Sequence, residues 1–164
     1  MQVLGLVDHG TRACLGLEVL RRKTTVALLR VVLDMVERFG APGAIRTNNE
    51  ACFTSGLFRT ALRLLGIRHQ RTAVMAPWQN GRIERFFGTF KARAREWLAS
   101  VEAARLQPEL DVFRAWYNGV RPHRHLDGLQ AAEVWNGARQ SKGRGPWCLF
   151  DAWEERLRGF YRRP

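Results

Sequence analysis

The sequence predicts an α/β fold in which helices pack on a mixed sheet. Short apolar runs typical of strands alternate with stretches of helical period, in the order strand, strand, helix, strand, helix, strand, helix, helix. The length of 164 residues and the apolar content of 46% are sufficient for one hydrophobic core. The pattern therefore predicts a single α/β domain. It does not indicate what chemistry the domain performs, which has to be inferred from sequence motifs.

The first elements are a hairpin and an amphipathic helix. Apolar runs at 2–8 and 13–20 flank the segment HGTR, which predicts a β-hairpin. From Thr24 onward the period becomes helical, and it ends at the Gly-Ala-Pro segment 40–42. The predicted inward stripe of this helix consists of Val26, Leu29, Leu33 and Val36.

Two short strands follow, with a helix between them. Residues 44–48 and 67–74 are typical of strands, while Ser55 is a plausible N-cap and Gly66 a plausible helix end. The side chains that we expect to face inward from this helix are Leu57, Phe58, Ala61, Leu62 and Leu65.

The second half of the chain is predicted to be mainly helical. Pro77 and Gly81 precede a long helix whose predicted buried stripe is Ile83, Phe87, Phe90, Ala94 and Trp97. The apolar positions of the next helix are Leu110, Phe113, Trp116 and Tyr117. A short helical turn is expected within 131–137, and a basic linker and an amphipathic tail follow residue 138.

The charge of the chain favours a polyanionic partner. Lys and Arg number 27 against 15 Asp and Glu, which gives a net charge of +12. Each phosphate that such a surface neutralises releases counterions, so nucleic acid is the expected partner. An anionic membrane is disfavoured because the basic residues are spread along the chain, and no apolar run is long enough to span a bilayer.

The cysteines also limit the possible classes of protein. Cys14, Cys52 and Cys148 are far apart and odd in number, and no CxxC pair occurs. This pattern favours neither a zinc knuckle nor a disulfide framework. We expect free or buried thiols in a reducing cytoplasm, with the protein associated with the nucleoid when it is bound to DNA.

Three ordered segments carry a family resemblance. They are IRTNNEACFTS (45–55), PWQNGRIERFFGTFK (77–91) and FRAWYNGVRPHRHLDG (113–128). In this order they resemble the catalytic core of retroviral-type integrases and insertion-sequence transposases, over roughly residues 3–137. The resemblance implies a ribonuclease-H-like fold, DNA as substrate, and a homo-oligomer as the functional form. It also implies an Asp–Asp–Glu triad that holds two Mg²⁺ (or Mn²⁺) ions.

The resemblance assigns two residues to the catalytic positions. Glu84 matches the family's metal-binding Glu, and Asn48 stands at the position of the second Asp, with 35 residues between them. The alternative for Glu84 is a surface glutamate paired with Arg82 or Arg85. Because Mg²⁺ selects anionic oxygen ligands, an amide at position 48 predicts a catalytically defective chain unless Glu50 substitutes for it.

Polar and basic residues around Glu84 are predicted to contact the DNA backbone. Gly88 would leave room for a strand to approach the helix. The alternative is an ordinary solvated basic face, and zinc binding by His123 and His125 is not expected because a second ligand pair is lacking. The predicted DNA-binding residues are Gln79, Asn80, Arg82, Arg85, Lys91, Arg95, Arg121 and His123.

The family's first Asp lies on a strand that precedes the first hairpin. Asp8 is therefore interpreted either as a residue that closes a turn through Arg12 or as a displaced first ligand. On the first interpretation we expect the sheet to lack its first strand, which lies at its middle, and the sequence to be part of a longer transposase. The predicted segments are a partial catalytic core (1–100), the C-terminal helices of the core (101–137), and a basic linker with an aromatic tail (138–164).

Together these observations predict a transposase- or integrase-like protein of DNA integration that is catalytically defective as written. The fold is expected to be a ribonuclease-H-like mixed sheet flanked by helices, without its first strand and with a helical C-terminal extension. The alternative is a non-catalytic remnant that binds nucleic acid or acts as an oligomeric interaction module. The tail aromatics that could serve such a module, or could simply pack in the core, are Trp147, Trp153, Phe160 and Tyr161.

Overall fold

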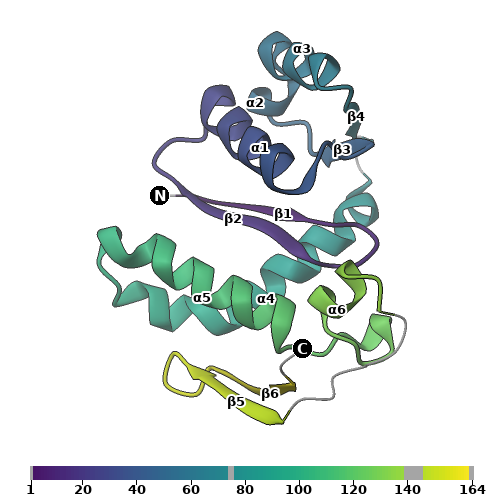
Figure 1. Cartoon of the computed structure of the whole chain (residues 1–164). Coiled ribbons are helices and arrows are strands. Elements are labelled where there is room, and N and C mark those ends of the chain that lie inside the picture. The colour runs from purple at the N-terminus through teal and green to yellow at the C-terminus, as the bar shows by residue number, and fades with distance from the viewer. Residues whose placement is uncertain (1, 74–75, 139–145, 163–164) are drawn as a thin grey trace. The chain divides into compact units, whose positions relative to one another are not determined.

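The computed structural model describes residues 2–73, 76–138 and 146–162 of the chain. Its elements follow the predicted order of strands and helices (Figure 1). In the first half they are β1 (Gln2–Val7), β2 (Cys14–Leu20), α1 (Thr25–Phe39), β3 (Ala44–Thr47), α2 (Ala51–Thr54), α3 (Gly56–Leu64) and β4 (Arg68–Arg71). In the second half they are η1 (Pro77–Asn80), α4 (Gly81–Ala99), η2 (Ala103–Arg105), α5 (Leu106–Gly119), η3 (Arg124–Leu126), α6 (Ala131–Trp135), β5 (Trp147–Ala152) and β6 (Leu157–Arg162).

The strands form two-stranded sheets. β1 pairs with β2 as the predicted hairpin, β3 pairs in parallel with β4, and β5 pairs antiparallel with β6. Among the described residues, no strand joins the β1–β2 pair to the β3–β4 pair. The absence of the family's first strand stays a prediction.

The chain divides into two compact units. One unit comprises Met1–Leu4 with Glu18–Glu84, and the other comprises Gly5–Leu17 with Arg85–Pro164. The β1–β2 hairpin and α4 contribute residues to both units. In the described part of the chain, no helix combines the length and the apolar character needed to cross a membrane.

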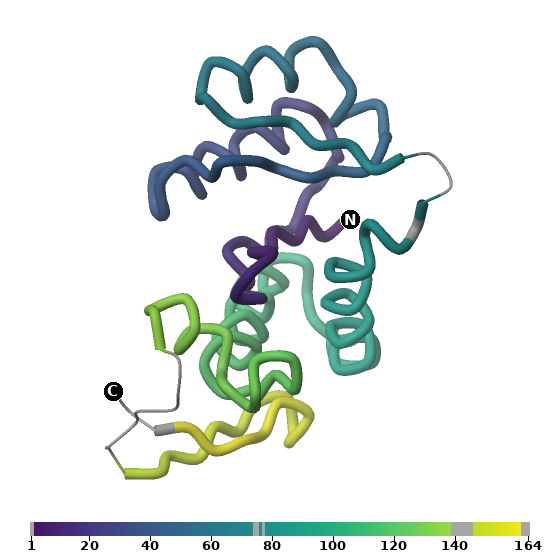
Figure 2. The backbone as a smooth tube through the Cα atoms, turned by 90° about the vertical axis from the view of Figure 1, so that its right-hand side faces the viewer, coloured from purple at the N-terminus to yellow at the C-terminus, as the bar shows by residue number. Residues whose placement is uncertain are grey.

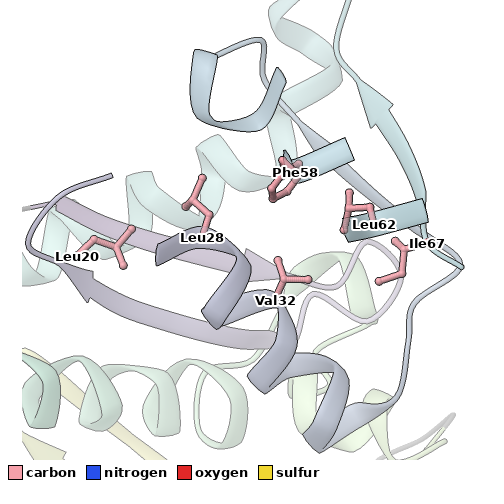
Figure 3. Close-up of a cluster of buried hydrophobic side chains, with 6 residues drawn as sticks. All are labelled: Leu20, Leu28, Val32, Phe58, Leu62 and Ile67. Atoms are coloured by element: carbon pink, nitrogen blue, oxygen red, sulfur yellow. The ribbon is translucent and has the colours of Figure 1, made fainter. Parts of the chain in front are cut away.

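Helices α1 and α3 enclose the core of the first unit. Figure 3 shows its buried side chains, which come from β2, α1, α3 and the residue before β4: Leu20, Leu28, Val32, Phe58, Leu62 and Ile67. Burying a side chain of this size contributes about 1.5–3 kcal/mol to the free energy of unfolding. The ends of α1 are fixed locally, because the Thr24 hydroxyl accepts a hydrogen bond from the Ala27 N–H and Gly40 follows the last turn with φ of 82°.

The four helices of more than eight residues were predicted, but the inward faces of α1 and α3 were only partly right. On α1 the buried residues are Leu28, Val32 and Met35, while Val26 and Leu33 are 51% and 49% exposed. On α3, Leu57 is likewise exposed. Both helices carry apolar residues on more than one face, so periodicity alone could not decide which face packs inward.

Helices α4 and α5 form the core of the second unit through their aromatic residues. Phe86, which the predicted stripe of α4 omitted, is fully buried and packs edge-to-face on Phe113 and Tyr117 of α5. Phe90 also packs edge-to-face on Phe113. The close approach of Gly5 to Phe86 and Phe87 explains the glycine, because a Cβ at position 5 would lie only 3.0–3.1 Å from their rings.

The tail is a β-hairpin attached to α4 and α5, where the sequence had predicted only an amphipathic segment. Figure 2 shows its two strands as the yellow end of the tube, and β6 lies against α5. Trp153, in the turn of the hairpin, is buried and stacks on Trp97 and Phe113. One carboxylate oxygen of Glu109 accepts hydrogen bonds from the indole N–H groups of Trp97 (3.1 Å) and Trp153 (2.7 Å).

Candidate active site and nucleic-acid interface

Asn48 follows the last residue of β3, where the parallel strands β3 and β4 end together. Thr47 pairs with Arg71, and the Thr72 N–H donates to the Thr47 carbonyl at 3.0 Å. The next side chain, Asn49, donates to the Thr72 carbonyl at 2.8 Å. The polar residues after β3 and β4 are therefore held together at one edge of the sheet, which is where α/β folds commonly place functional groups.

The carboxamide of Asn48 is engaged by Glu50. Its Nδ2 donates to Glu50 Oε1 at 2.6 Å, and its Oδ1 accepts from the Glu50 N–H at 3.3 Å. Lys23 forms an ion pair with the other carboxylate oxygen of Glu50 at 2.5 Å. The hydrogen bond from Lys23, followed by the one from Asn48, lowers the pKa of Glu50 despite partial burial.

These contacts bear on the possibility that Glu50 replaces the missing aspartate. The Glu50 side chain turns back to Asn48 instead of pointing into the following loop, so it does lie beside the catalytic position. Its charge is already compensated by Lys23, however, and Asn48 offers only one neutral oxygen, which the Glu50 N–H uses. Lys23 lies 25 residues before Asn48, and no sequence pattern linked the two.

Glu84 lies in the first turn of α4 and is exposed. Among the described residues, its carboxylate has no hydrogen-bond or ion-pair partner, so the predicted alternative of a pair with Arg82 or Arg85 is not present. The segment that leads into α4 is tied to the ends of β3 and β4. Gln79 accepts from the Ala73 N–H at 2.8 Å through its side chain and from Arg46 at 3.4 Å through its carbonyl.

The donor set does not suit the two-ion centre that the family resemblance implied. Within the described residues, no group of three or more His, Cys, Asp or Glu side chains could hold a metal ion. Asn48 is neutral and engaged, while Glu84 is a single carboxylate. Hard cations such as Mg²⁺ require several anionic or strongly polar oxygens, so these two residues by themselves do not form such a site.

Asp8 closes the turn of the first hairpin. Its Oδ2 accepts from the Gly10 N–H (3.0 Å), the Thr11 N–H (2.8 Å) and the Thr11 hydroxyl (2.8 Å). Partial burial acts to raise the pKa of Asp8, but the hydrogen bonds, led by those from Thr11, lower it overall. The interpretation as a turn residue therefore fits. The Arg12 N–H also donates to the Asp8 carbonyl at 3.2 Å, while the Arg12 guanidinium donates to the His9 carbonyl.

One face of α4 presents the predicted DNA-binding residues to solvent. Glu84, Gly88, Lys91 and Arg95 recur at spacings of four, three and four, which places them on the same side of the helix, and all four are exposed. We call these residues the α4 face. Gly88 lies in the middle of the helix, and a Cβ built there would meet no atom within 4 Å. Packing within the chain therefore gives no reason for this glycine.

The other predicted contacts near α4 are also exposed, except Asn80. Gln79, Arg82 and Arg85 lie at the surface, and Asn80 is half-buried. Arg93, on the same helix, serves a different purpose. Its guanidinium donates to the Arg156 carbonyl at 2.9 Å and lies over the Trp116 ring, which helps to hold the tail hairpin.

His123 does not fit the predicted role of a phosphate contact. It is 6% exposed, its Nε2 lies 3.3 Å from the Tyr117 carbonyl, and its Nδ1 lies 3.1 Å from Arg121 Nη1. These partners suit a neutral imidazole that donates from Nε2 and accepts at Nδ1. Burial, with smaller contributions from Arg121 and Arg12, lowers the pKa of His123 to about 4 against the opposing effect of the Tyr117 carbonyl. Arg121 is half-buried, and its guanidinium lies over the Tyr117 ring.

Comparisons with known proteins place this geometry in a family context. Residues 65–130 match the model of the integrase core domain. The "Insertion element IS476 uncharacterized 39.2 kDa protein" of Xanthomonas euvesicatoria is 34% identical over 139 residues, which cover 81% of this chain and 38% of that protein. An uncharacterized protein of Caenorhabditis elegans is 32% identical over 116 residues, which cover 71% of this chain and 9% of that protein. The chain thus spans well under half the length of these curated relatives.

Solved structures share the fold at low sequence identity. A chain of the simian T-cell lymphotropic virus intasome, solved with the PP2A regulatory subunit B56 gamma, matches with a TM-score of 0.72 and 17% identity, covering 99% of this chain and 65% of that chain. The catalytic core domain of BIV integrase matches with a TM-score of 0.66 and 18% sequence identity. The match covers 82% of this chain and 84% of that chain. The HTLV-2 integrase catalytic core domain in complex with magnesium matches with a TM-score of 0.64 and 17% sequence identity. The match covers 81% of this chain and 91% of that chain.

Proposed function

We propose that this chain is the DNA-binding core of an insertion-element transposase and that it performs no strand transfer as it stands. The match of residues 65–130 to the integrase core domain supports this proposal, as does the fold that the chain shares with retroviral integrase catalytic cores. DNA is the proposed partner, and a homo-oligomer the proposed functional form. The segment assignments 1–100, 101–137 and 138–164 remain part of this proposal, as does a place with the nucleoid in the cytoplasm.

The observation that carries the proposal is the α4 face. It lies within the segment that matches the integrase core domain, and it combines an exposed carboxylate, two cations and a glycine that packing does not explain. Lys91 and Arg95 suit phosphate oxygens, and Gly88 between them and Glu84 would let a sugar–phosphate backbone lie close to the helix. Together these features support sequence-independent binding of DNA along α4.

The arrangement around Asn48 supports the second half of the proposal. Strand transfer by this family's chemistry requires paired divalent ions, which stabilise both the attacking and the leaving oxygen. Asn48 and Glu50 form a closed hydrogen-bonded pair compensated by Lys23, and among Asn48, Glu50 and Glu84 only Glu84 carries an uncompensated carboxylate. The loss of one of three carboxylate ligands is expected to cost several kcal/mol of transition-state stabilisation, which is roughly 10³-fold or more in rate.

Two assays of the purified chain test the two halves separately. DNA affinity, measured by fluorescence anisotropy, should fall for Lys91→Ala/Arg95→Ala more than for Arg30→Ala/Arg38→Ala, a control that removes the same charge from exposed positions of α1. Equal effects of the two double variants would contradict binding along α4. Incubation of supercoiled plasmid with Mg²⁺ or Mn²⁺ should give no nicks; nicks that disappear in Glu84→Gln would overturn the catalytic half.

A second candidate function is supported by the tail hairpin. Trp147, Leu149 and Phe160 project from one face of the β5–β6 pair and are 62%, 49% and 63% exposed, with Leu149 directly opposite Phe160 in the register. Large apolar side chains gathered in this way are typical of an interaction surface. An oligomeric interaction module is therefore the alternative to a DNA-binding core, and the two are compatible in one chain.

A further inference from the structure

A second basic surface lies outside the α4 face, on the segment that contains α2, α3 and β4. Residues 51–83 contain no Asp or Glu and five arginines. In a chain with 15 acidic residues, such a stretch concentrates uncompensated positive charge on one part of the first unit. None of the predicted DNA-binding residues lies between residues 51 and 78.

The exposed face of α3 carries two of these arginines. Arg59 and Arg63 are four residues apart, so their side chains lie one above the other on the helix, and both are exposed. They border an open depression of about 400 Å³ that is lined by Gly56, Arg59, Thr60 and Arg63. The hydroxyl of Thr60, which lines the same depression, adds a hydrogen-bond donor.

A second depression, at the ends of β3 and β4, is also lined by an arginine and by neutral polar side chains. It has a volume of about 670 Å³ and is lined by Asn49, Thr54, Arg71, Thr72 and Ala73. Arg71 supplies the cation, and amide and hydroxyl groups supply neutral polar contacts. Neither depression is lined by an apolar side chain larger than alanine, so neither resembles a pocket for a hydrophobic ligand or an apolar side chain of a protein partner.

Arg59 and Arg71 come from different elements, but both act on the same histidine. Both repel a proton on His69: burial is the main cause of the lowered pKa of this histidine, and the two arginines add to it. The Thr47 hydroxyl, 2.9 Å from His69 Nε2, holds the ring in place. The arginines of α3 and β4 thus contribute to one field.

Among the residues that the structure describes, no carboxylate forms an ion pair with these arginines. The ion pairs present among the described residues involve Lys23, Arg105, Arg114, Arg156 and Arg158, and none of them includes Arg59, Arg63 or Arg71. Glu50, the acid nearest in sequence, is already paired with Lys23. Exposed guanidinium groups interleaved with hydroxyl and amide donors are the groups that proteins use to contact phosphate oxygens of DNA.

We propose that Arg59, Arg63 and Arg71, with Thr60 between the first two, form a second surface for the phosphodiester backbone of DNA, distinct from the α4 face. This inference rests on the proposed function, because it assigns a further contact to the same partner. Its expected role is sequence-independent binding, since phosphate contacts fix position and carry no base information.

The test compares three double variants of the full chain, each checked for an unchanged thermal melt. They are Arg59→Ala/Arg63→Ala, the α1 control Arg30→Ala/Arg38→Ala, and the α4 variant Lys91→Ala/Arg95→Ala. Affinity for a short DNA duplex is measured over a range of KCl concentrations. Two lost phosphate contacts should reduce the slope of log affinity against log salt by about 2 and weaken binding roughly tenfold or more at low salt, whereas the control should change little.

The outcomes separate this inference from the proposed function. If Arg59→Ala/Arg63→Ala behaves like the control while the α4 variant loses affinity, the second surface is refuted and the proposed function stands. If neither differs from the control, both proposals fail. If the α3 variant loses binding to phosphatidylserine vesicles and keeps its affinity for DNA, the surface belongs to an anionic membrane and the inference is overturned.

Discussion

At the scale of single residues, the structure separates side chains that serve the fold from side chains that are available to a partner. His123 and Glu84 illustrate the difference. Both belong to family motifs, yet His123 is buried between Tyr117 and Arg121, while Glu84 is exposed and has no partner among the described residues. A motif therefore identified both positions, and only burial distinguished their roles.

The burial of His123 predicts a pH-dependent stability. Its folded-state pKa of about 4 lies below the ordinary value of 6.5, so the unfolded chain binds the proton more readily between these values. The contribution of neutral His123 is complete above pH 6.5 and is lost as the pH falls toward 4, by roughly 3 kcal/mol in total. Urea unfolding at pH 7 and pH 4.5 should show this loss.

Two variants isolate the residue from the carboxylates that also titrate in acid. His123→Gln should lower the free energy of unfolding at pH 7. It should also make the difference between the free energies of unfolding at pH 7 and pH 4.5 smaller. His125→Gln, which alters an exposed histidine two residues away, should leave that change intact. The same pH dependence in both variants would show that His123 does not titrate in the buried position.

At the scale of elements, α4 combines a structural face with a face that the fold does not use. Phe86, Phe90 and Ala94 are buried, and the opposite side carries the α4 face. A glycine in the middle of a helix costs about 0.8–1.0 kcal/mol relative to alanine. Since no atom of the described residues outside the helix's own backbone lies within 4 Å of a Cβ built at Gly88, packing does not offset this loss of stability.

The substitution Gly88→Ala should therefore separate stability from binding. We expect the free energy of unfolding to rise by about 0.5–1 kcal/mol, because alanine is the better helix former. We expect DNA affinity to fall, because the added methyl group stands where a sugar–phosphate backbone would pass. Denaturant unfolding and fluorescence anisotropy measure the two effects.

Gly43→Ala is a matched control in the loop before β3, since a Cβ there also meets no atom within 4 Å. It should leave DNA affinity unchanged. A Gly88→Ala chain that is more stable and binds DNA as well as the unaltered protein would remove the argument that the glycine admits a DNA strand.

At the scale of the whole molecule, the basic core is followed by a tail hairpin. One side of this hairpin packs on the core, and the other side is exposed. Trp153 anchors the hairpin through Glu109 and the rings of Trp97 and Phe113. Trp147, Leu149 and Phe160 on the other face remain open to solvent. In the proposed homo-oligomer, we expect a second copy of the chain to cover this face.

This expectation is tested by sedimentation of the purified chain over a range of concentrations. Leu149→Ser/Phe160→Ser should shift the molecule toward the monomer, because it removes the centre of the apolar face without touching Trp153. Val26→Ser/Leu33→Ser, which alters the half-exposed apolar residues of α1, tests the other candidate surface. An unaltered association in the tail variant would exclude the hairpin as the oligomer contact.

The sequence by itself determined the class of the protein and the order of its elements. The spacing of apolar residues predicted each helix of more than eight residues and the first four strands, because local periodicity and caps such as Ser55 act within a few residues. The three motifs indicated a resemblance to the integrase catalytic core, which the match of residues 65–130 to the integrase core domain supports, and the amide at position 48 was evident from the sequence alone.

Only the tertiary structure decided which faces and side chains are available. The inward face of α1, the burial of His123, the pairing of Asn48 with Glu50 and Lys23, and the hairpin form of the tail all depend on residues distant in sequence. Such contacts leave no local pattern, because the free energy of burial and pairing is set by what packs against a side chain.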